Sequence, residues 1–327
     1  MIGLSRALVV LALIVIVFGA YVRLTDAGLG CPDWPGCYGR LLVPQQAGIH
    51  LEDPDWHFRP LEEGKAWREM AHRYLASTLG LGILILAGLT FAQRSSTAPT
   101  NLSRWPIYAT VPLVMFQGLL GMWTVTLLLK PLVVSAHLLG GLATLSLLWW
   151  FQLGLSRPAP AAVRSDPLLV RWAQVTLVIL LTQIFLGGWT STNYAALACT
   201  DFPTCQGRWW PQTDFNEAFI LWRGLGTNYE FGVLETPART AIHLTHRIGA
   251  VLTTLALGAL IFRAMRSANP HARPVAWCIL AALVTQVALG ITNVLAGLPL
   301  AVAVAHNGVA AILLLTLLSL LHLARRY

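Results

Sequence analysis

The sequence alternates between long apolar runs and shorter polar segments. Eight of the apolar runs approach the roughly 20 residues that an α-helix needs to cross a bilayer. Eight such runs in 327 residues leave little chain for a soluble domain, so the pattern predicts an all-α polytopic membrane protein. The expected membrane spans are Ala7–Arg23, Glu69–Phe91, Pro106–Leu128, Leu132–Leu153, Trp172–Trp189, Thr240–Phe262, Val275–Leu295 and Leu300–Leu323.

The composition agrees with this pattern, and the charges indicate an orientation. The chain is 56% hydrophobic and 11% charged, and its mean hydropathy is +0.64. If the N-terminus is cytoplasmic, only one acid, Asp166, falls in the inner loops. This asymmetry predicts that both termini are cytoplasmic. The net charge of +8 is then a topology signal and not a nucleic-acid footprint, because no basic stripe accompanies it. The inner-loop arginines are Arg6, Arg94, Arg104, Arg157, Arg164, Arg171, Arg263, Arg266, Arg273, Arg325 and Arg326.

The second half of the chain repeats the polar motifs of the first. A cysteine pair followed by Gly-Arg recurs 168 positions later, a His-Arg pair 174 positions later, and a Gln-x3-Gly motif and an isolated histidine 169 positions later. Such a repeat predicts two equivalent four-helix bundles, 1–168 and 169–327. Four crossings are an even number, so a pseudo-twofold axis along the membrane normal should relate them. The repeated residues are Cys31/Cys199, Cys37/Cys205, Gly39/Gly207, Arg40/Arg208, His72/His246, Arg73/Arg247, Gln117/Gln286, Gly121/Gly290 and His137/His306.

Two outer loops are long, about Leu24–Arg68 and Thr190–Arg239, and each carries a cysteine pair near its start. On the oxidising face of a membrane such pairs persist as disulfides. A structural staple and a redox role both stay open for them. Cys278 has no partner and is expected to be a small core hydrophobe. Six loop tryptophans predict either an interfacial aromatic belt or a platform for an apolar substrate: Trp34, Trp56, Trp67, Trp209, Trp210 and Trp222.

Four of the nine histidines fall on repeated positions, two in each half. His72 and His246 are expected in the first turn or two of their helices, and His137 and His306 one to two turns into theirs, all at similar depth near the outer surface. Ionisable residues inside a membrane mark function by default. Two imidazoles from facing helices can clamp an iron porphyrin, so the pairs predict two bis-histidine haem sites. Zinc is disfavoured because each pair lacks further ligands, except for Glu69 in one half.

The repeat breaks beside one member of each histidine pair. Glu69 stands three residues before His72, whereas His243 stands three residues before His246. Positions i and i+3 share a helix face, so Glu69 should point toward whatever His72 binds, where it can relay protons or stabilise positive charge. An acid that complements the helix dipole is the alternative. One acidic site out of two suggests one haem that is chemically modified and one that carries electrons.

Arg73 and Arg247 each follow a histidine at the outer end of a helix. Their guanidinium groups can extend to the membrane interface or pair with haem propionates, and their repetition favours the propionates. The histidines without a repeat partner receive no role; they are His50, His57, His271 and His322.

Together these motifs resemble those of the haem A synthase family. The resemblance rests on GLGCPDWPGCYGRLLVPQ in the first loop, EMAHR at 69–73, the second His-Arg pair and the two isolated histidines, and it spans essentially the whole chain. It implies a membrane oxidoreductase that oxidises the C8 methyl group of haem O to a formyl group through successive hydroxylations. The product would be haem A, a cytochrome oxidase cofactor.

The same resemblance implies a division of labour between the two halves. His72 and His137 would ligate the substrate haem O, with Glu69 as the catalytic acid residue. His246 and His306 would hold haem b as the cofactor. The implied partners are haem O, membrane lipid, haem O synthase and an electron donor or acceptor, with no nucleic acid.

The resemblance also implies that Cys31–Cys37 and Cys199–Cys205 form disulfides, the first of them with a part in turnover. The alternative function is a di-haem b-type electron-transfer cytochrome, although such a protein normally places its haems at different depths. A thiol-oxidising protein would leave the histidines unused, and a transporter would need broken helices or a polar midplane site. The electron donor or acceptor, the source of the formyl oxygen and the oligomeric state, a homo-oligomer included, stay open.

Overall fold

Long helices make up most of the part of the protein that its computed structural model describes, which is residues 1–45, 60–93, 103–155 and 166–325. Within these ranges eight helices are long and apolar enough to cross a membrane. The predicted all-α polytopic fold is therefore confirmed. The spanning helices are α1 (Ile2–Leu24), α2 (Glu63–Ala92), α3 (Trp105–Thr126), α4 (Pro131–Leu155), α5 (Pro167–Thr192), α7 (Thr236–Met265), α8 (Ala272–Leu295) and α9 (Leu300–Arg325), while α6 (Phe215–Ala218) is one turn in the loop after α5.

Two histidine-bearing helices begin a turn or more before their apolar runs. α2 starts with an acid, Glu63, in its first turn, and α7 starts at Thr236 with a proline in its first turn. Both features are favourable at a helix N-terminus, so each helix extends past the apolar segment that hydropathy detects. His72 and His246 consequently lie in about the third turn of their helices. The expectation that they lie in the first turn or two is wrong.

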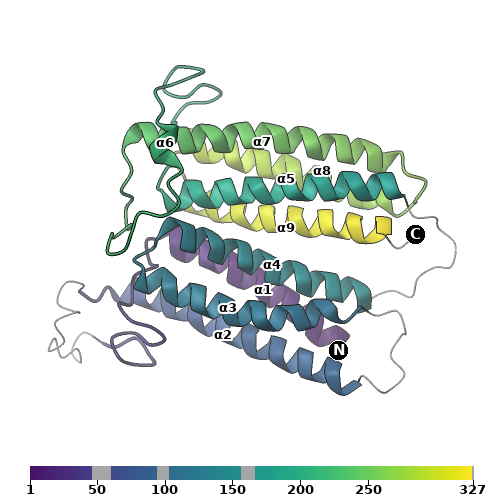
Figure 1. Ribbon diagram of the computed structural model, residues 1–327, viewed down its shortest axis with the longest axis horizontal. Helices are drawn as coiled ribbons and strands as arrows, with labels where there is room; N and C mark the ends of the chain where they lie inside the picture. Colours follow the sequence, from purple (N-terminus) through teal and green to yellow (C-terminus); the bar gives the residue numbers. More distant parts are fainter. Residues whose placement is uncertain (46–59, 94–102, 156–165, 326–327) are drawn as a thin grey trace.

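Each half of the chain packs its four long helices in a ring. α1 and α3 each contact α2 and α4 in the first half, and α5 and α8 each contact α7 and α9 in the second. The halves meet through α1, α4, α5 and α9. Figure 1 shows the two sets of helices running alongside each other, with both chain ends at one end of the helices and the loop that carries α6 at the other.

The junction between the halves brings repeat-related residues together. At the loop-bearing end, Arg23 Nη2 donates to Ser191 O at 2.7 Å, 168 positions away. Toward the opposite end, Trp149 Nε1 donates to Ser319 Oγ at 2.9 Å, 170 positions away. A residue beside a twofold axis lies next to its own symmetry mate, so these contacts favour a pseudo-twofold axis along the helices. That axis, and the division into units 1–168 and 169–327, stay interpretations.

The end that carries both termini also holds Asp166, the one acid expected in the inner loops. Its carboxylate accepts from Leu169 N at 3.1 Å, which caps α5, and from Arg263 Nη2 at 2.7 Å. The acid is therefore neutralised where it stands. Some residues assigned a place from the sequence lie outside the described ranges: Arg94, Arg157, Arg164, Arg326, His50, His57 and Trp56.

The free cysteine differs from expectation. Cys278 is exposed on α8, so the prediction of a core residue is wrong, because this thiol occupies an outward-facing position of its helix. Trp67, expected in the first outer loop, lies in α2, because that helix begins at Glu63. The described tryptophans of the set are each more than 40% exposed, as an aromatic belt or a substrate platform would both require: Trp34, Trp67, Trp209, Trp210 and Trp222.

The turn between α3 and α4 is clamped to the long loop of the second half. Lys130 in this turn is only 2% exposed. Its Nζ donates to Gly224 O and lies 3.5 Å from the centroid of the Trp222 ring. Tyr229 N donates to Leu128 O at 3.0 Å beside it. The first half thus holds part of the second outer loop in place through a buried ammonium group.

We expect Lys130→Met to release this loop, because the change removes a buried charge-assisted hydrogen bond worth about 1.5–3 kcal/mol. Tryptic cleavage after Arg223 in the reconstituted protein should become about tenfold faster or more, since proteolysis follows local opening. Lys65→Met is the matched control, because Lys65 pairs only with the exposed Glu62 at 2.9 Å and such pairs contribute little. Equal cleavage rates for the wild type and Lys130→Met would contradict the clamp.

Candidate functional site

The two histidines of each half lie on helices that stand diagonally in their ring. His72 is on α2 and His137 on α4, while His246 is on α7 and His306 on α9. Within the described residues, no Cα of α2 lies within 8 Å of α4, and none of α7 within 8 Å of α9. His72 interacts electrostatically with His137, and His246 with His306. The structure thus places the two histidines of each predicted pair on opposite helices of one ring.

Each of the four imidazoles rests against a glycine of a neighbouring helix. A Cβ added to Gly19 on α1 would come within 2.9 Å of His72 Cε1, and one on Gly187 of α5 within 3.2 Å of His246 Cε1. The other two histidines have the same arrangement. The corresponding distances are 3.6 Å for Gly121 on α3 and His137, and 3.1 Å for Gly290 on α8 and His306. A Cβ at Gly19 would force the His72 imidazole to shift, one at Gly187 or Gly290 would crowd its histidine, and one at Gly121 would only contact His137. Three of the four glycines thus give an imidazole room that a larger residue would reduce.

The imidazole nitrogens include several without a hydrogen-bond partner. In the described part of the chain, Nδ1 of His72, His137 and His306 is buried and unpaired. Gln183 Nε2 donates to His246 Nδ1 at 3.0 Å, and Gln286 Nε2 lies 3.2 Å from His306 Nε2. Unpaired buried polar atoms are rare and call for an explanation such as a functional site. Two imidazoles from one ring are of the right chemical type to occupy the two axial positions of an iron porphyrin.

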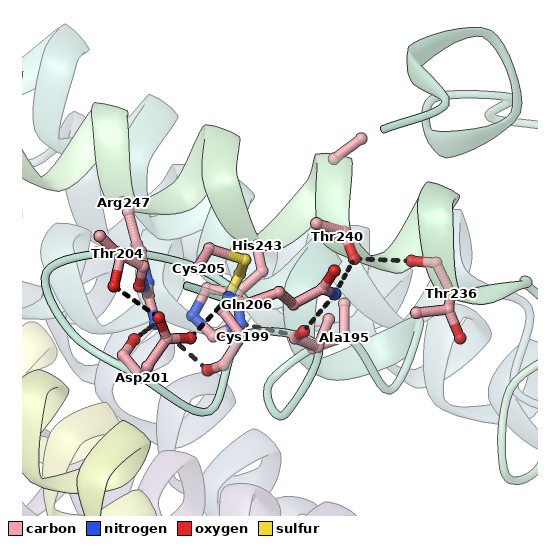
Figure 2. The surroundings of a disulfide bond; sticks show 12 residues. Ala195, Cys199, Asp201, Thr204, Cys205, Gln206, Thr236, Thr240, His243 and Arg247 are labelled. Atoms are coloured by element: carbon pink, nitrogen blue, oxygen red, sulfur yellow. Dashed lines mark hydrogen bonds between the residues drawn. A yellow bond between two sulfur atoms is a disulfide. The ribbon is translucent and has the colours of Figure 1, made fainter. Parts of the chain in front are cut away.

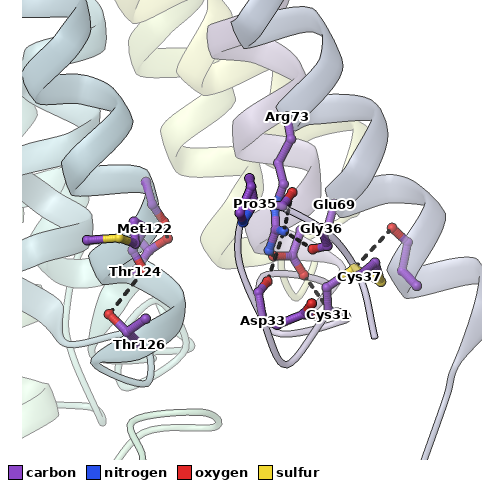
Figure 3. Close-up of polar contacts among 12 residues, drawn as sticks. Cys31, Asp33, Pro35, Gly36, Cys37, Glu69, Arg73, Met122, Thr124 and Thr126 are labelled. Atoms are coloured by element: carbon purple, nitrogen blue, oxygen red, sulfur yellow. Dashed lines mark hydrogen bonds and ion pairs between the residues drawn. A yellow bond between two sulfur atoms is a disulfide. The ribbon is translucent and has the colours of Figure 1, made fainter. Parts of the chain in front are cut away.

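Glu69 is joined to the first cysteine loop. It is 5% exposed, its Oε2 accepts from Cys31 N at 2.8 Å, and its Oε1 accepts from Arg73 Nη2. Arg73 Nη1 in turn donates to three loop carbonyls, including Asp33 O at 3.0 Å and Gly36 O at 2.5 Å. Figure 3 shows the guanidinium reaching from α2 into the loop. The i, i+4 spacing of Glu69 and Arg73 signals their pairing, but nothing in the sequence signals the contact with Cys31.

The second half has the same arginine contacts without a carboxylate. Arg247 Nη1 donates to Thr204 O at 2.7 Å, and its Nη2 to Asp201 O at 2.8 Å. His243, which replaces Glu69, instead donates through Nδ1 to Ala195 O at 2.9 Å. These contacts are drawn in Figure 2. The structure therefore gives His243 an anchoring contact, which the sequence left open.

Both cysteine pairs are bonded, and both loops close with the same turn. Cys31 and Cys37 are joined at an S–S distance of 2.06 Å, and Cys199 and Cys205 at 1.96 Å. In the second loop Thr204 Oγ1 and the backbone N–H groups of residues 206 and 207 donate to the Asp201 carboxylate. These bonds lower the pKa of Asp201 to about 2, because they favour its charged form.

The first loop holds its aspartate in the same way. Asp33 accepts from Tyr38 N at 2.6 Å and from Gly39 N at 2.8 Å. The two loops are thus similar in their turns and differ in the side chain that the following helix places beside them, Glu69 on α2 and His243 on α7. Because the guanidinium groups of Arg73 and Arg247 already bind loop carbonyls, their contact with haem propionates stays a prediction.

Comparison with known proteins places the chain in one family. The model of the cytochrome oxidase assembly protein family COX15-CtaA matches residues 4–318. A protein of Shewanella oneidensis named "Heme A synthase" is 46% identical over 322 residues, which cover 97% of this chain and 94% of that protein. Proteins of the same name from Paracoccus denitrificans and Halalkalibacterium halodurans are 28% and 27% identical, and cover 95% and 93% of the chain and 84% and 90% of their own length. The chain belongs to the COX15-CtaA family of cytochrome oxidase assembly proteins.

Proposed function

We propose that this membrane protein is a haem A synthase, which oxidises the C8 methyl group of haem O to a formyl group through successive hydroxylations. One observation carries the proposal: two matched histidine pairs lie on opposite helices of the two helix rings, and in the sequence only His72 has an acid three residues before it. The relatives that cover nearly the whole chain bear the name of this activity.

The first half is the proposed substrate site and the second the proposed cofactor site. His72 and His137 would ligate the iron of haem O, and His246 and His306 that of a resident haem b. The paired imidazoles seated on glycines fit this ligand set. The resident haem supplies an electron-transfer route for the oxidation. Haem O carries a long apolar tail, so a site among membrane-spanning helices suits its solubility.

Glu69 is the proposed catalytic acid residue. Its carboxylate can accept a proton or stabilise positive charge that develops at the substrate. In the second half, Arg247 and His243 make the equivalent contacts without a carboxylate. A loop of this kind can therefore be attached without an acid at that position, which favours a chemical role for Glu69 over a purely structural one.

The proposed orientation places both termini in the cytoplasm and the two disulfide loops outside. Both termini lie at the same end of the helices, opposite the loops, and the described arginines of the inner loops cluster there. An oxidising compartment on the loop side suits the two disulfides. Haem O synthase and an electron donor or acceptor are the proposed partners.

The pigment of the purified protein tests the proposal. We expect haem b close to one per chain, together with haem O or haem A in variable, substoichiometric amount, because substrate and product exchange at only one of the two sites. Acid–acetone extraction followed by chromatography would identify the haem types. Two stoichiometric haem b groups would favour the electron-transfer cytochrome, and a protein without haem would rule out both functions.

Mutation of the histidines should separate the two halves. His246→Ala or His306→Ala deletes an axial ligand and should remove the resident haem b absorbance. His72→Ala or His137→Ala should leave most of that absorbance while haem A formation stops. His271→Ala, outside both pairs, is the control and should change neither signal. Equal loss of haem b from mutations in either half would contradict the assignment.

Glu69→Gln tests the catalytic acid residue. Glutamine can still accept the hydrogen bond from Cys31 N, but it cannot carry the charge or accept a proton. Haem b should be retained while haem A formation falls about 10²–10⁴-fold. Glu63→Gln, an exposed acid in the first turn of the same helix, should cost only about 0.3–1 kcal/mol of local stability. If Glu69→Gln forms nearly as much haem A as the wild type, the role of Glu69 is structural and not catalytic.

A further inference from the structure

The guanidinium of Arg73 binds two separate parts of the protein at once. One nitrogen, Nη1, donates to the carbonyls of Asp33, Pro35 and Gly36 within the first disulfide loop, at 3.0, 3.2 and 2.5 Å. The other, Nη2, donates to Glu69 Oε1, one turn earlier on α2. Arg73 is only 13% exposed along its side chain. It therefore forms a partly buried bridge between the loop and the carboxylate.

The equivalent arginine of the second half binds the loop alone. Both terminal nitrogens of Arg247 donate to loop carbonyls, those of Thr204, Asp201 and Cys199. A loop of this kind is thus held by an arginine whether or not a carboxylate stands nearby. The additional bond from Arg73 to Glu69 has no arginine–carboxylate counterpart at Arg247 in the described residues, and it fixes one oxygen of the Glu69 carboxylate.

Both oxygens of Glu69 are fixed by groups that belong to, or are held by, the loop. Oε1 is bound by Arg73, and Oε2 accepts from the N–H of Cys31 at 2.8 Å, inside the disulfide-closed segment. A carboxylate held at both oxygens has a defined position and direction. A displacement of about 1 Å in a catalytic group can cost about 10²-fold in rate.

We propose that Arg73 is a positioning residue for haem O oxidation, which fixes the Glu69 carboxylate relative to the Cys31–Cys37 loop. This inference rests on the proposed function of Glu69. Its planar guanidinium reaches the loop carbonyls and the carboxylate together, which a lysine ammonium on a flexible stem does not reproduce. The inference differs from a propionate contact, because a propionate partner acts on substrate binding, whereas a positioning residue acts on conversion.

The test separates binding from conversion in Arg73→Gln and Arg73→Lys. Haem O affinity is measured by absorbance titration of the purified full-length protein, and conversion by the haem A to haem O ratio in membranes with equal amounts of protein. We expect haem O affinity and haem b content to stay within about threefold of the wild type, and conversion by Arg73→Gln to fall about 10–100-fold. Arg73→Lys should recover part of the conversion, since it keeps the charge.

Arg68→Gln is the matched control, one turn away on α2. Its Nε donates to the carbonyl of Gly64 in its own helix at 2.8 Å, and its guanidinium lies 6.0 Å from the centroid of the Tyr21 ring on α1. Among the described residues it has no hydrogen bond to the first disulfide loop or to Glu69, so conversion should be unaffected. If Arg73→Gln does not accumulate in the membrane, the comparison of haem O affinity with conversion is made on Arg73→Lys. We then expect unchanged affinity and a conversion below that of the wild type.

Two outcomes would overturn this inference and leave the proposed role of Glu69 intact. In the first, haem O affinity falls in proportion to conversion, which indicates a propionate contact or a purely structural role for Arg73. In the second, both Arg73 variants convert haem O normally while Glu69→Gln is inactive. Normal conversion by Glu69→Gln would instead remove the proposed role of Glu69, and this inference with it.

Discussion

The structure depends on placing two imidazoles inside each ring of membrane-spanning helices. Polar groups inside a membrane are costly unless they have hydrogen-bond partners. Among the described residues, three of the four imidazoles nevertheless keep a buried nitrogen without a hydrogen-bond partner. Helix packing around these side chains is set by glycines on the flanking helices. The glycines leave room for imidazoles on the two diagonal helices, whose described Cα atoms stay more than 8 Å apart. The arrangement suits a flat ligand held from both faces.

The outer ends of the rings show how a repeated scaffold can acquire one distinctive site. Arg73 and Arg247 attach their disulfide loops in closely similar ways. The difference lies one turn earlier, where Glu69 binds the loop backbone and the arginine, whereas His243 binds a carbonyl. A change of one side chain therefore introduces a charge into one of two otherwise similar environments.

The sequence predicts the membrane spans well, because a bilayer imposes a length and an apolar character that hydropathy records directly. It predicts the starts of α2 and α7 poorly, because their first turns are polar and lie beyond the apolar run. The position of Cys278 could not be predicted, since either face of a membrane helix is apolar.

The candidate site was only partly accessible from the sequence. The histidine pairs follow from the repeat, and Gly121 and Gly290 recur with them. Gly19 and Gly187 also stand 168 positions apart, and they lie against His72 and His246. Their spacing could have identified them as part of the repeat. The contacts of Glu69 and Arg73 with the first loop required the folded path of that loop, which no local pattern specifies.

The most direct test of the account is the electron paramagnetic resonance spectrum of the ferric protein before and after one equivalent of haem O is added. Two axial imidazoles make haem iron low-spin. The account predicts a stoichiometric low-spin haem b signal at first, with a second low-spin signal that is substoichiometric. After haem O is added, the second signal should grow to the size of the first, and His72→Ala should abolish it. A high-spin haem O signal, or two low-spin signals of equal size before any haem O is added, would contradict a substrate site built from the first histidine pair.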